Sequence, residues 1–338
     1  MILFCAEDAG PAQNLSILIS GMMEPRCAVY AGPVAHGIFR SNGIDSFPVS
    51  KPYKAGEIDA ILRKIAPHLV VTGTSWGKSL EKYVILAARK IGARTISIVE
   101  FWSWYAERFR LGDEDAIPDH IIVNDLTAKE EAILEGLPAD RIYPLGNLAL
   151  ERMAGEDIRT VPEDEWRRSL GLPGKDIVAF ISEDYTKVNS DKKDSPYGFD
   201  EHDVIGDILG AARQDQHILI KLHPSENKNK YDRLRGERVT VSAGAGKGPL
   251  IAYPKFFIGM GSMLLMEAAL HRRDVVSYRP GEKKGFIGNK FGVTCPVKDK
   301  ESLGGILSGA KKISNKDFKD RFNGSFERIA DFIRKNTA

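Results

Sequence analysis

Short runs of consecutive apolar residues alternate along this chain with longer stretches in which apolar residues recur at helical spacing. Consecutive apolar residues are typical of strands that are buried on both faces, as in a parallel sheet. Strands are predicted at Ile2–Ala6, Cys27–Ala31, 68–72, 94–99, His120–Val123, 141–145, 176–182, 217–222, Val239–Ser242, Phe256–Gly259 and 274–277. The alternation of these strands with helical stretches predicts an α/β fold in which helices cover parallel sheets.

A charged, proline-containing stretch at 151–165 divides the alternating elements into two sets. The length of 338 residues also agrees with two domains. We therefore predict an N-terminal domain over 1–152 and a C-terminal domain over 160–338. The polar stretch 184–203 is expected to form a mobile loop beside the end of a strand.

The tail of the chain predicts an amphipathic helix, which we expect to belong to the C-terminal domain. Its aromatic and aliphatic residues recur at three- and four-residue spacing. They are Phe318, Phe322, Phe326, Ile329 and Phe332.

Composition and charge exclude several classes of protein. The chain has 48 Lys and Arg against 46 Asp and Glu, a balance that argues against general nucleic-acid binding. The three cysteines, Cys5, Cys27 and Cys295, lack the spacing of a zinc site or a disulfide framework and favour a reducing cytoplasm. No apolar run reaches the roughly 18–20 residues that span a bilayer, so we expect at most peripheral membrane contact.

Ligands of open parallel sheets bind at the carboxyl ends of the strands. Glu7, Asp8 and Gly10 directly follow the first predicted strand. Adjacent carboxylates there suit general-base chemistry or the binding of a sugar hydroxyl, and Gly10 permits a sharp turn into a helix. A helix cap at Asp8 is the structural alternative.

Glu100 also follows a predicted strand, and an aromatic segment at 101–105 comes next. Carboxylates beside aromatic faces are typical of sugar sites. Gly73-Thr74-Ser75 follows a neighbouring strand and leaves room for a ligand. The alternative for Trp102 and Trp104 is a role in the hydrophobic core.

Lys221, His223 and Pro224 end a strand in the second half of the chain. Lys221 and His223 lie two residues apart and therefore on one side of the strand. Their cationic groups suit a diphosphate or the protonation of a leaving phosphate, although a lone histidine is often structural.

Gly261 and Ser262 form a turn between a predicted strand and a helix, and Glu267 follows in that helix. The turn would present backbone N–H groups to a phosphate, and Glu267 would accept hydrogen bonds from both ribose hydroxyls. The structural alternative is an N-cap serine followed by an incidental glutamate.

Together these segments resemble the GT-B superfamily of nucleotide-sugar enzymes, which includes glycosyltransferases and UDP-N-acetylglucosamine 2-epimerases. The segments that carry the resemblance are Glu7–Gly10, 70–74, 98–100, 140–147, 221–224, and Gly261-Ser262 with Glu267. The resemblance implies two Rossmann-like domains that face each other across a cleft, an acceptor-side domain first and a nucleotide-binding domain second. It also places Glu267 on the ribose, Gly261 and Ser262 on the phosphates, and Ser182 near the nucleotide.

The chain departs from the epimerases at three of their motifs. Cys5–Pro11 lacks the arginine of their Gly-Thr-Arg-Pro-Glu segment, Thr74 stands where they carry aspartate, and Ser182-Glu183-Asp184 replaces their His-Arg pair. Within the epimerase acid/base set, only Glu100 has a counterpart here.

The resemblance and the candidate residues predict a glycosyltransferase-like enzyme of surface-polysaccharide or glycoconjugate synthesis. Its co-substrate would be a UDP- or CMP-type sugar, its acceptor a glycan or a lipid-linked glycan, with no tightly bound cofactor and no metal. Asp8 or Glu7 would be the base, while His223 and Lys221 would neutralise the leaving phosphate. A nucleotide-sugar epimerase or hydrolase, and a non-catalytic binding protein, are the alternatives.

Overall fold

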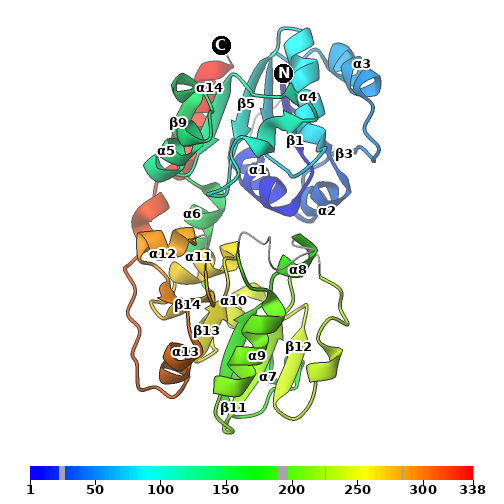
Figure 1. Ribbon diagram of the computed structural model, residues 1–338. Coiled ribbons are helices and arrows are strands. Elements are labelled where there is room, and N and C mark those ends of the chain that lie inside the picture. Colours follow the sequence, from blue (N-terminus) through cyan, green and yellow to red (C-terminus); the bar gives the residue numbers. More distant parts are fainter. Residues whose placement is uncertain (23–26, 189–196, 225, 283–284, 338) are drawn as a thin grey trace. The chain divides into compact units, whose positions relative to one another are not determined.

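The computed structural model describes residues 1–22, 27–188, 197–224, 226–282 and 285–337, and the chain forms two compact units (Figure 1). The first unit contains Met1–Arg152 and Phe322–Ala338, and the second contains Met153–Arg321. Each unit is built around one parallel sheet.

The first unit has a seven-stranded parallel sheet in the order β3-β2-β1-β4-β5-β8-β9. Its strands are β1 (Ile2–Ala6), β2 (Cys27–Ala31), β3 (Phe47–Pro48), β4 (Leu69–Thr72), β5 (Arg94–Ile98), β8 (His120–Val123) and β9 (Ile142–Pro144). A small antiparallel pair, β6 (Arg110–Leu111) and β7 (Glu114–Asp115), lies outside this sheet. Cys5 pairs with Tyr30 on one side and with Thr72 on the other, which sets the register of the central strands.

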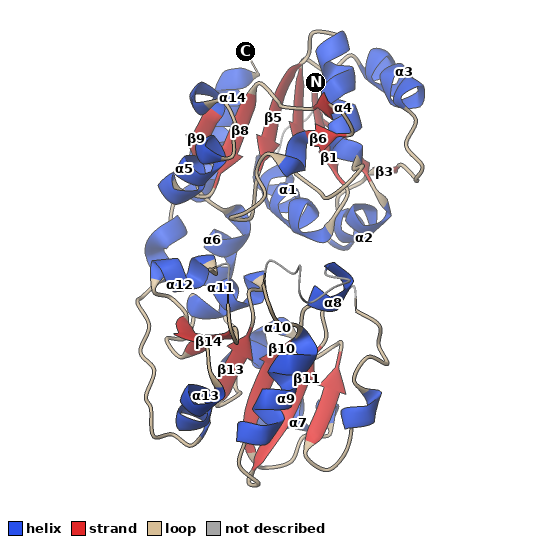
Figure 2. Cartoon of the chain, in the orientation of Figure 1, coloured by secondary structure: helices blue, strands red, loops and turns tan. Residues whose placement is uncertain are grey.

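Helices cover both faces of this sheet (Figure 2). They are α1 (Ala9–Met22), α2 (Pro33–Ser41), α3 (Ala55–Ile65), α4 (Leu80–Lys90), α5 (Leu126–Leu134), α6 (Leu148–Gly155) and α14 (Ser325–Asn336), with the 3-10 turns Glu107–Phe109 and Ala139–Arg141. Ile2 and Phe4 of β1 lie in one hydrophobic cluster, whereas Leu3 and Cys5 lie in the other. Burial on both faces explains why the strand is a continuous apolar run.

The terminal helix α14 belongs to the first unit and not, as the sequence indicated, to the second domain. Ile329, Ala330 and Ile333 are fully buried in the cluster that contains Ile2 and Phe4. Amphipathic spacing predicts that a helix has a buried face, but it does not specify which sheet that face covers.

The second unit has a six-stranded parallel sheet in the order β12-β11-β10-β13-β14-β15. Its strands are β10 (Asp176–Ile181), β11 (Gln216–Lys221), β12 (Val239–Ser242), β13 (Phe256–Gly259), β14 (Val275–Tyr278) and β15 (Cys295–Val297). Its helices are α7 (Glu163–Leu170), α8 (Tyr185–Val188), α9 (Glu201–Ala211), α10 (Lys247–Ala252), α11 (Met263–Ala269), α12 (Ile287–Phe291) and α13 (Lys300–Leu307), with 3-10 turns at Asp232–Leu234 and Lys319–Phe322. The sequence did not predict the edge strands β3 and β15, which have only two and three residues.

The predicted mobile loop at 184–203 lies partly outside the described residues, which omit 189–196. Its described flanks are packed. Tyr185 stacks on Tyr197 with ring centroids 4.4 Å apart, and Asp200 forms a capping box at the start of α9. Within the described part of the chain, no helix is both long and apolar enough to cross a membrane.

Candidate functional site

Each sheet has one point at which the strand order reverses, and the candidate residues gather there. In the first unit the chain runs from β1 outward to β3 and then returns to β4 on the other side of β1. In the second unit it runs from β10 outward to β12 and returns to β13. Ligands of doubly wound sheets bind outside the carboxyl ends of the strands at such points.

Glu7 has partners for both carboxylate oxygens and is only 5% exposed. The N–H of Leu80 donates to Oε2 at 2.7 Å, and Lys51 Nζ lies 2.5 Å from Oε1. These contacts fasten the end of β1 to the start of α4. They leave the neighbouring Asp8 as the better candidate for the base.

Asp8 is partly exposed at the same strand end. Burial and the nearby carboxylate of Glu7 raise the pKa of Asp8, while hydrogen bonds from Trp76 and Ser75 oppose that rise. The N–H of Asp8 in turn donates to Ser75 Oγ at 3.1 Å. A partly exposed carboxylate with a raised pKa has the properties required of a general base.

Glu100 lies close to Gly10, although β4 separates β1 from β5 in the sheet. A Cβ atom at Gly10 would stand 3.3 Å from Glu100 Oε1, so the glycine leaves room for this carboxylate. Thr74 Oγ1 donates to Glu100 Oε2 at 3.4 Å, and Arg108 Nη1 lies 3.8 Å from Oε1. Burial raises the pKa of Glu100, and the positive charge of Arg108 opposes this effect.

Arg108 is a functional candidate that the sequence analysis missed, because no spacing or motif marks it. It is 4% exposed and donates to the backbone oxygen and the hydroxyl of Thr74, both at 3.2 Å. Its guanidinium also lies over the ring of Trp76, 5.3 Å from the centroid. Arg108 therefore connects Thr74 and Glu100 to an aromatic surface.

The two tryptophans of the aromatic segment have different environments. Trp102 is 4% exposed and donates from Nε1 to Asp125 at 3.1 Å, so it belongs to the core. Trp104 is 39% exposed and lies edge-on to Trp76, which is 49% exposed. The exposed pair, Trp76 and Trp104, offers a surface on which a sugar ring can stack.

Glu81 is a buried residue that holds two strand-end loops together. Its Oε1 accepts hydrogen bonds from Ser75 Oγ at 2.6 Å and from the N–H of Glu7 at 3.0 Å. Its Oε2 is buried without a hydrogen-bond partner among the described residues. Burial raises the pKa of Glu81 to about 7, so the side chain titrates near neutral pH. The sequence provided no sign of this role, since Glu81 lies in the first turn of an ordinary helix.

In the second unit, β11 ends at Lys221, and the exposed His223 lies two residues further along the chain. Its N–H donates to Glu226 Oε2 at 2.6 Å. Partial desolvation lowers the pKa of His223, and the carboxylate of Glu226 opposes that effect. The exposure is consistent with the catalytic prediction and differs from the alternative of a histidine packed under the sheet. Lys221 is half-buried, and its Nζ donates to the backbone oxygen of Leu222 at 2.5 Å.

The hydroxyl of Ser182 is committed to internal hydrogen bonds. It donates to Glu226 Oε1 at 2.7 Å, lies 2.7 Å from Tyr231 Oη, and is 1% exposed. The hydroxyl of Ser182 therefore holds Glu226 in place and is not available to a nucleotide. A nucleotide at this strand end could contact only the residues around Ser182.

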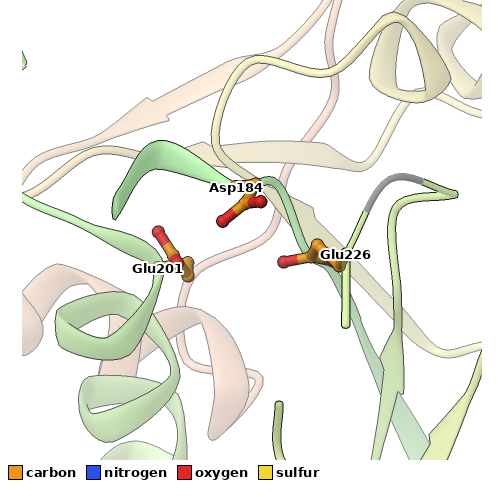
Figure 3. A group of neighbouring side chains, drawn as sticks. All are labelled: Asp184, Glu201 and Glu226. Atoms are coloured by element: carbon orange, nitrogen blue, oxygen red, sulfur yellow. The ribbon is translucent and has the colours of Figure 1, made fainter. Parts of the chain in front are cut away.

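Three carboxylates converge beside Ser182, those of Asp184, Glu201 and Glu226 (Figure 3). The ammonium of Lys230 lies among them: its Nζ is 2.7 Å from Glu226 and 3.2 Å from Asp184, and it also pairs with Glu201. Because the ammonium of Lys230 already lies where the three carboxylates converge, the cluster does not argue for a metal ion. Glu226 links the cluster to the backbone of His223.

The predicted phosphate cradle holds a carboxylate of the protein itself. The N–H of Gly261 donates to Glu183 Oε2 at 2.7 Å, while Ser262 Oγ caps α11 by accepting from Leu264 N at 3.2 Å. Burial raises the pKa of Glu183 to about 7. In the sequence, Glu183 is marked only as part of a departure from the epimerases, and no spacing connects it with Gly261.

Glu267 is partly buried and pairs with Lys247, whose Nζ lies 2.9 Å from Oε1. Lys247 also lines a cavity of about 480 Å³ within the second unit, together with Met153 and Ile158. Lys247 therefore lies between Glu267 and the cavity, and a ribose would have to share the Glu267 carboxylate with Lys247.

Comparison with known proteins identifies the fold. No protein-family model and no curated protein sequence matches the chain. Among solved structures, UDP-GlcNAc 2-epimerase from Methanocaldococcus jannaschii in complex with UDP-GlcNAc and UDP matches with a TM-score of 0.72 and 16% identity, over 99% of this chain and 100% of that chain. The S. aureus MnaA–UDP structure matches with a TM-score of 0.68 and 12% identity, over 99% of this chain and 96% of that chain.

Anabaena HepE in complex with UDP-glucose matches with a TM-score of 0.64 and 12% identity, over 100% of this chain and 95% of that chain. These likenesses extend over both units and agree with two parallel sheets covered by helices. The protein therefore has the GT-B fold of two Rossmann-like domains, as the sequence resemblance predicted.

Proposed function

We propose that the protein is a nucleotide-sugar enzyme and that it transfers the sugar to a hydroxyl acceptor. Similarity over the whole chain to structures that contain UDP-sugars supports a UDP-type substrate. The observation that carries the transferase assignment is Asp8, a partly exposed carboxylate with a raised pKa at the strand-order reversal of the first unit.

In this reaction Asp8 takes the proton from the acceptor hydroxyl. The acceptor oxygen forms a bond to the anomeric carbon, and the bond from that carbon to the phosphate oxygen breaks. The departing nucleotide keeps the electron pair, and the imidazole N–H of His223 and the ammonium of Lys221 stabilise its charge. Glu267 binds the ribose, and Glu100 accepts a hydrogen bond from a sugar hydroxyl.

The aromatic pair Trp76 and Trp104 gives the first unit a surface for the acceptor sugar, because both rings are exposed and adjacent. The buried Arg108 holds this surface close to Glu100. A glycan or lipid-linked glycan acceptor suits such a surface, which supports a role in polysaccharide or glycoconjugate synthesis.

Two other functions are each favoured by one observation. The structural likeness to UDP-GlcNAc 2-epimerases, together with Glu100, favours a nucleotide-sugar epimerase or hydrolase. The carboxylate of Glu183 occupies the turn that would hold the phosphate of a substrate. This occupation favours a protein that keeps the fold and binds a ligand without catalysis.

Incubation with a panel of UDP- and CMP-sugars, with and without glycan acceptors, separates the three functions. A transferase releases nucleotide only when acceptor is present, and Asp8→Asn should abolish that release. An epimer or a free sugar formed without acceptor would instead identify an epimerase or hydrolase. Binding with no change in any nucleotide-sugar, with or without acceptor, would contradict both enzymatic assignments.

A further inference from the structure

A second concave region lies in the first unit, at the edge of the sheet opposite the candidate site. It is a cavity of about 650 Å³ lined by arginines at the amino ends of the strands. Arg94 and Thr95 begin β5, Asp119 directly precedes β8, and Arg141 directly precedes β9. These strands are parallel, so all their amino ends lie on one side of the sheet. Asp8 and Glu100 lie on the other side, beyond the carboxyl ends of β1 and β5.

Three guanidinium groups line this cavity, from Arg89, Arg94 and Arg141. These groups donate to backbone oxygens: Arg89 to Ile117 at 3.0 Å, Arg94 to Asn336 at 2.9 Å, and Arg141 only weakly to Pro118 at 3.4 Å. Among the residues that the structure describes, none of the three forms an ion pair with a carboxylate. Each guanidinium has five N–H donors, so most of this donor capacity remains available to a ligand.

The carboxylates of the cavity do not balance this charge. Asp119 lines it, but its Oδ2 accepts from both the N–H and the hydroxyl of Thr95, each at 2.8 Å. Asp115 is the other acidic residue of the lining. Three guanidinium groups against two carboxylates leave the cavity positive.

The positive charge of the cavity also affects His120, the first residue of β8. Burial lowers the pKa of His120, Asp119 opposes this effect, and the positive charges of Arg94 and Arg141 lower it further. Arg94 at the start of β5 and Arg141 directly before β9 thus act on the same residue.

We propose that this cavity, the arginine pocket, binds a phosphate group carried by a small molecule. Guanidinium groups bind phosphate oxygens in pairs, which makes arginine the side chain best suited to this ligand. The volume lies within the range of roughly 300–1,000 Å³ that is usual for small-molecule sites. The pocket uses none of the residues of the proposed reaction, so it is a second site on the protein.

Titration of the full chain with inorganic pyrophosphate tests the proposal. Backbone amide signals of Thr95 and Asp119, followed by NMR, should shift in a saturable way. The double variant Arg94→Gln/Arg141→Gln should weaken this binding by roughly tenfold or more, because two charge-assisted contacts are lost. The double variant Arg40→Gln/Arg63→Gln removes the same charge from exposed positions on α2 and α3 and should bind within about twofold of the parent.

Arg141→Gln alone provides a second measurement, since its only described bond is weak and the variant should fold normally. It should also lower pyrophosphate affinity. Absence of saturable shifts at Thr95 and Asp119, or equal affinity in the parent and both arginine-pocket variants, would overturn the proposal. Parallel titrations with phosphate and with citrate distinguish a phosphate site from a general anion site, and equal affinity for citrate would also count against it. Nucleotide-sugar turnover does not enter these measurements, so failure of the proposed enzymatic function would leave them unaffected.

Discussion

Glu183 Oε2 accepts a hydrogen bond of 2.7 Å from the backbone N–H of Gly261, in the turn where the sequence predicts a bound phosphate. An internal carboxylate therefore satisfies a donor that a nucleotide phosphate would need. Gly261 is required there, because a Cβ atom would lie 2.9 Å from Arg279 Nη1 and 3.0 Å from Tyr185 Oη. A phosphate can use this turn only if Glu183 moves or loses its charge.

We expect Glu183→Ala to strengthen UDP binding by about tenfold, since it removes both a competitor for the Gly261 N–H and a negative charge. Because the pKa of Glu183 is raised to about 7, UDP should also bind the parent more tightly at pH 6 than at pH 8. Calorimetric titrations of parent and variant at the two pH values measure both effects. Glu301→Ala, an exposed change on α13, is the control; weaker UDP binding by Glu183→Ala would contradict the interpretation.

Glu267→Ala should remove most of the stabilisation that UDP gives the folded protein, because the proposed ribose acceptor is lost. Thermal unfolding with and without UDP measures this effect. Lys247→Ala removes the partner that lies 2.9 Å from Glu267 and frees the carboxylate, so UDP should stabilise that variant at least as well as the parent. If both variants respond to UDP as the parent does, Glu267 does not bind the nucleotide.

His223→Ala should lower turnover of the nucleotide-sugar by about a hundredfold, because one donor to the charge that develops on the leaving phosphate is lost. The free energy of unfolding should change by less than about 0.5 kcal/mol, because the side chain is exposed. His223→Asn should restore only the part of the activity that depends on hydrogen bonding. Steady-state kinetics and urea unfolding of both variants test this split, and an Ala variant that unfolds would rule out the catalytic role.

Lys230→Met should destabilise the protein by roughly 3–5 kcal/mol, because breaking a buried ion pair leaves its partner uncompensated. The side chain of Lys230 is 10% exposed and that of Glu226 is fully buried. Lys228→Met, an exposed change two residues earlier, should have little effect. Chemical denaturation of the two variants makes the comparison, and similar stabilities would show that the cluster tolerates the loss of its cation.

Glu81→Gln should change how stability depends on pH. The folded pKa of Glu81, about 7, lies above the usual value for a glutamate, so the folded state holds this proton more tightly than the unfolded state. The stability that Glu81 contributes is therefore complete below about pH 4.3 and is lost as the pH rises through 7.

The parent should consequently lose up to roughly 4 kcal/mol from this group between acidic and alkaline pH, and the glutamine variant should not. The stability difference between variant and parent must then shift in favour of the variant from pH 5 to pH 8. Urea unfolding at several pH values provides the measurement, with the exposed Glu130→Gln as the control. A difference that does not vary with pH would show that Glu81 is charged throughout this range.

The sequence by itself determined the strands and the fold class, because strands buried on both faces must be apolar at every position. β1, β2, β8, β12 and β13 have the predicted bounds, and the other predicted strands differ by one residue at one or both ends. The same reasoning placed Asp8, Glu100, His223 and Gly261 after strands, where a parallel sheet presents its carboxyl ends. The edge strands β3 and β15 were missed because two or three residues carry no periodic pattern.

Tertiary structure alone decided which of these residues contact one another. Trp102 and Trp104 stand two residues apart in one aromatic segment, yet only the former is buried. The helix α14 packs on the first sheet, and Lys230 forms ion pairs with carboxylates that come from three separate segments. Glu183 meets Gly261 across 78 residues of sequence. Local spacing predicts what a residue type can do, but pairing, burial and charge compensation depend on which elements the fold brings together.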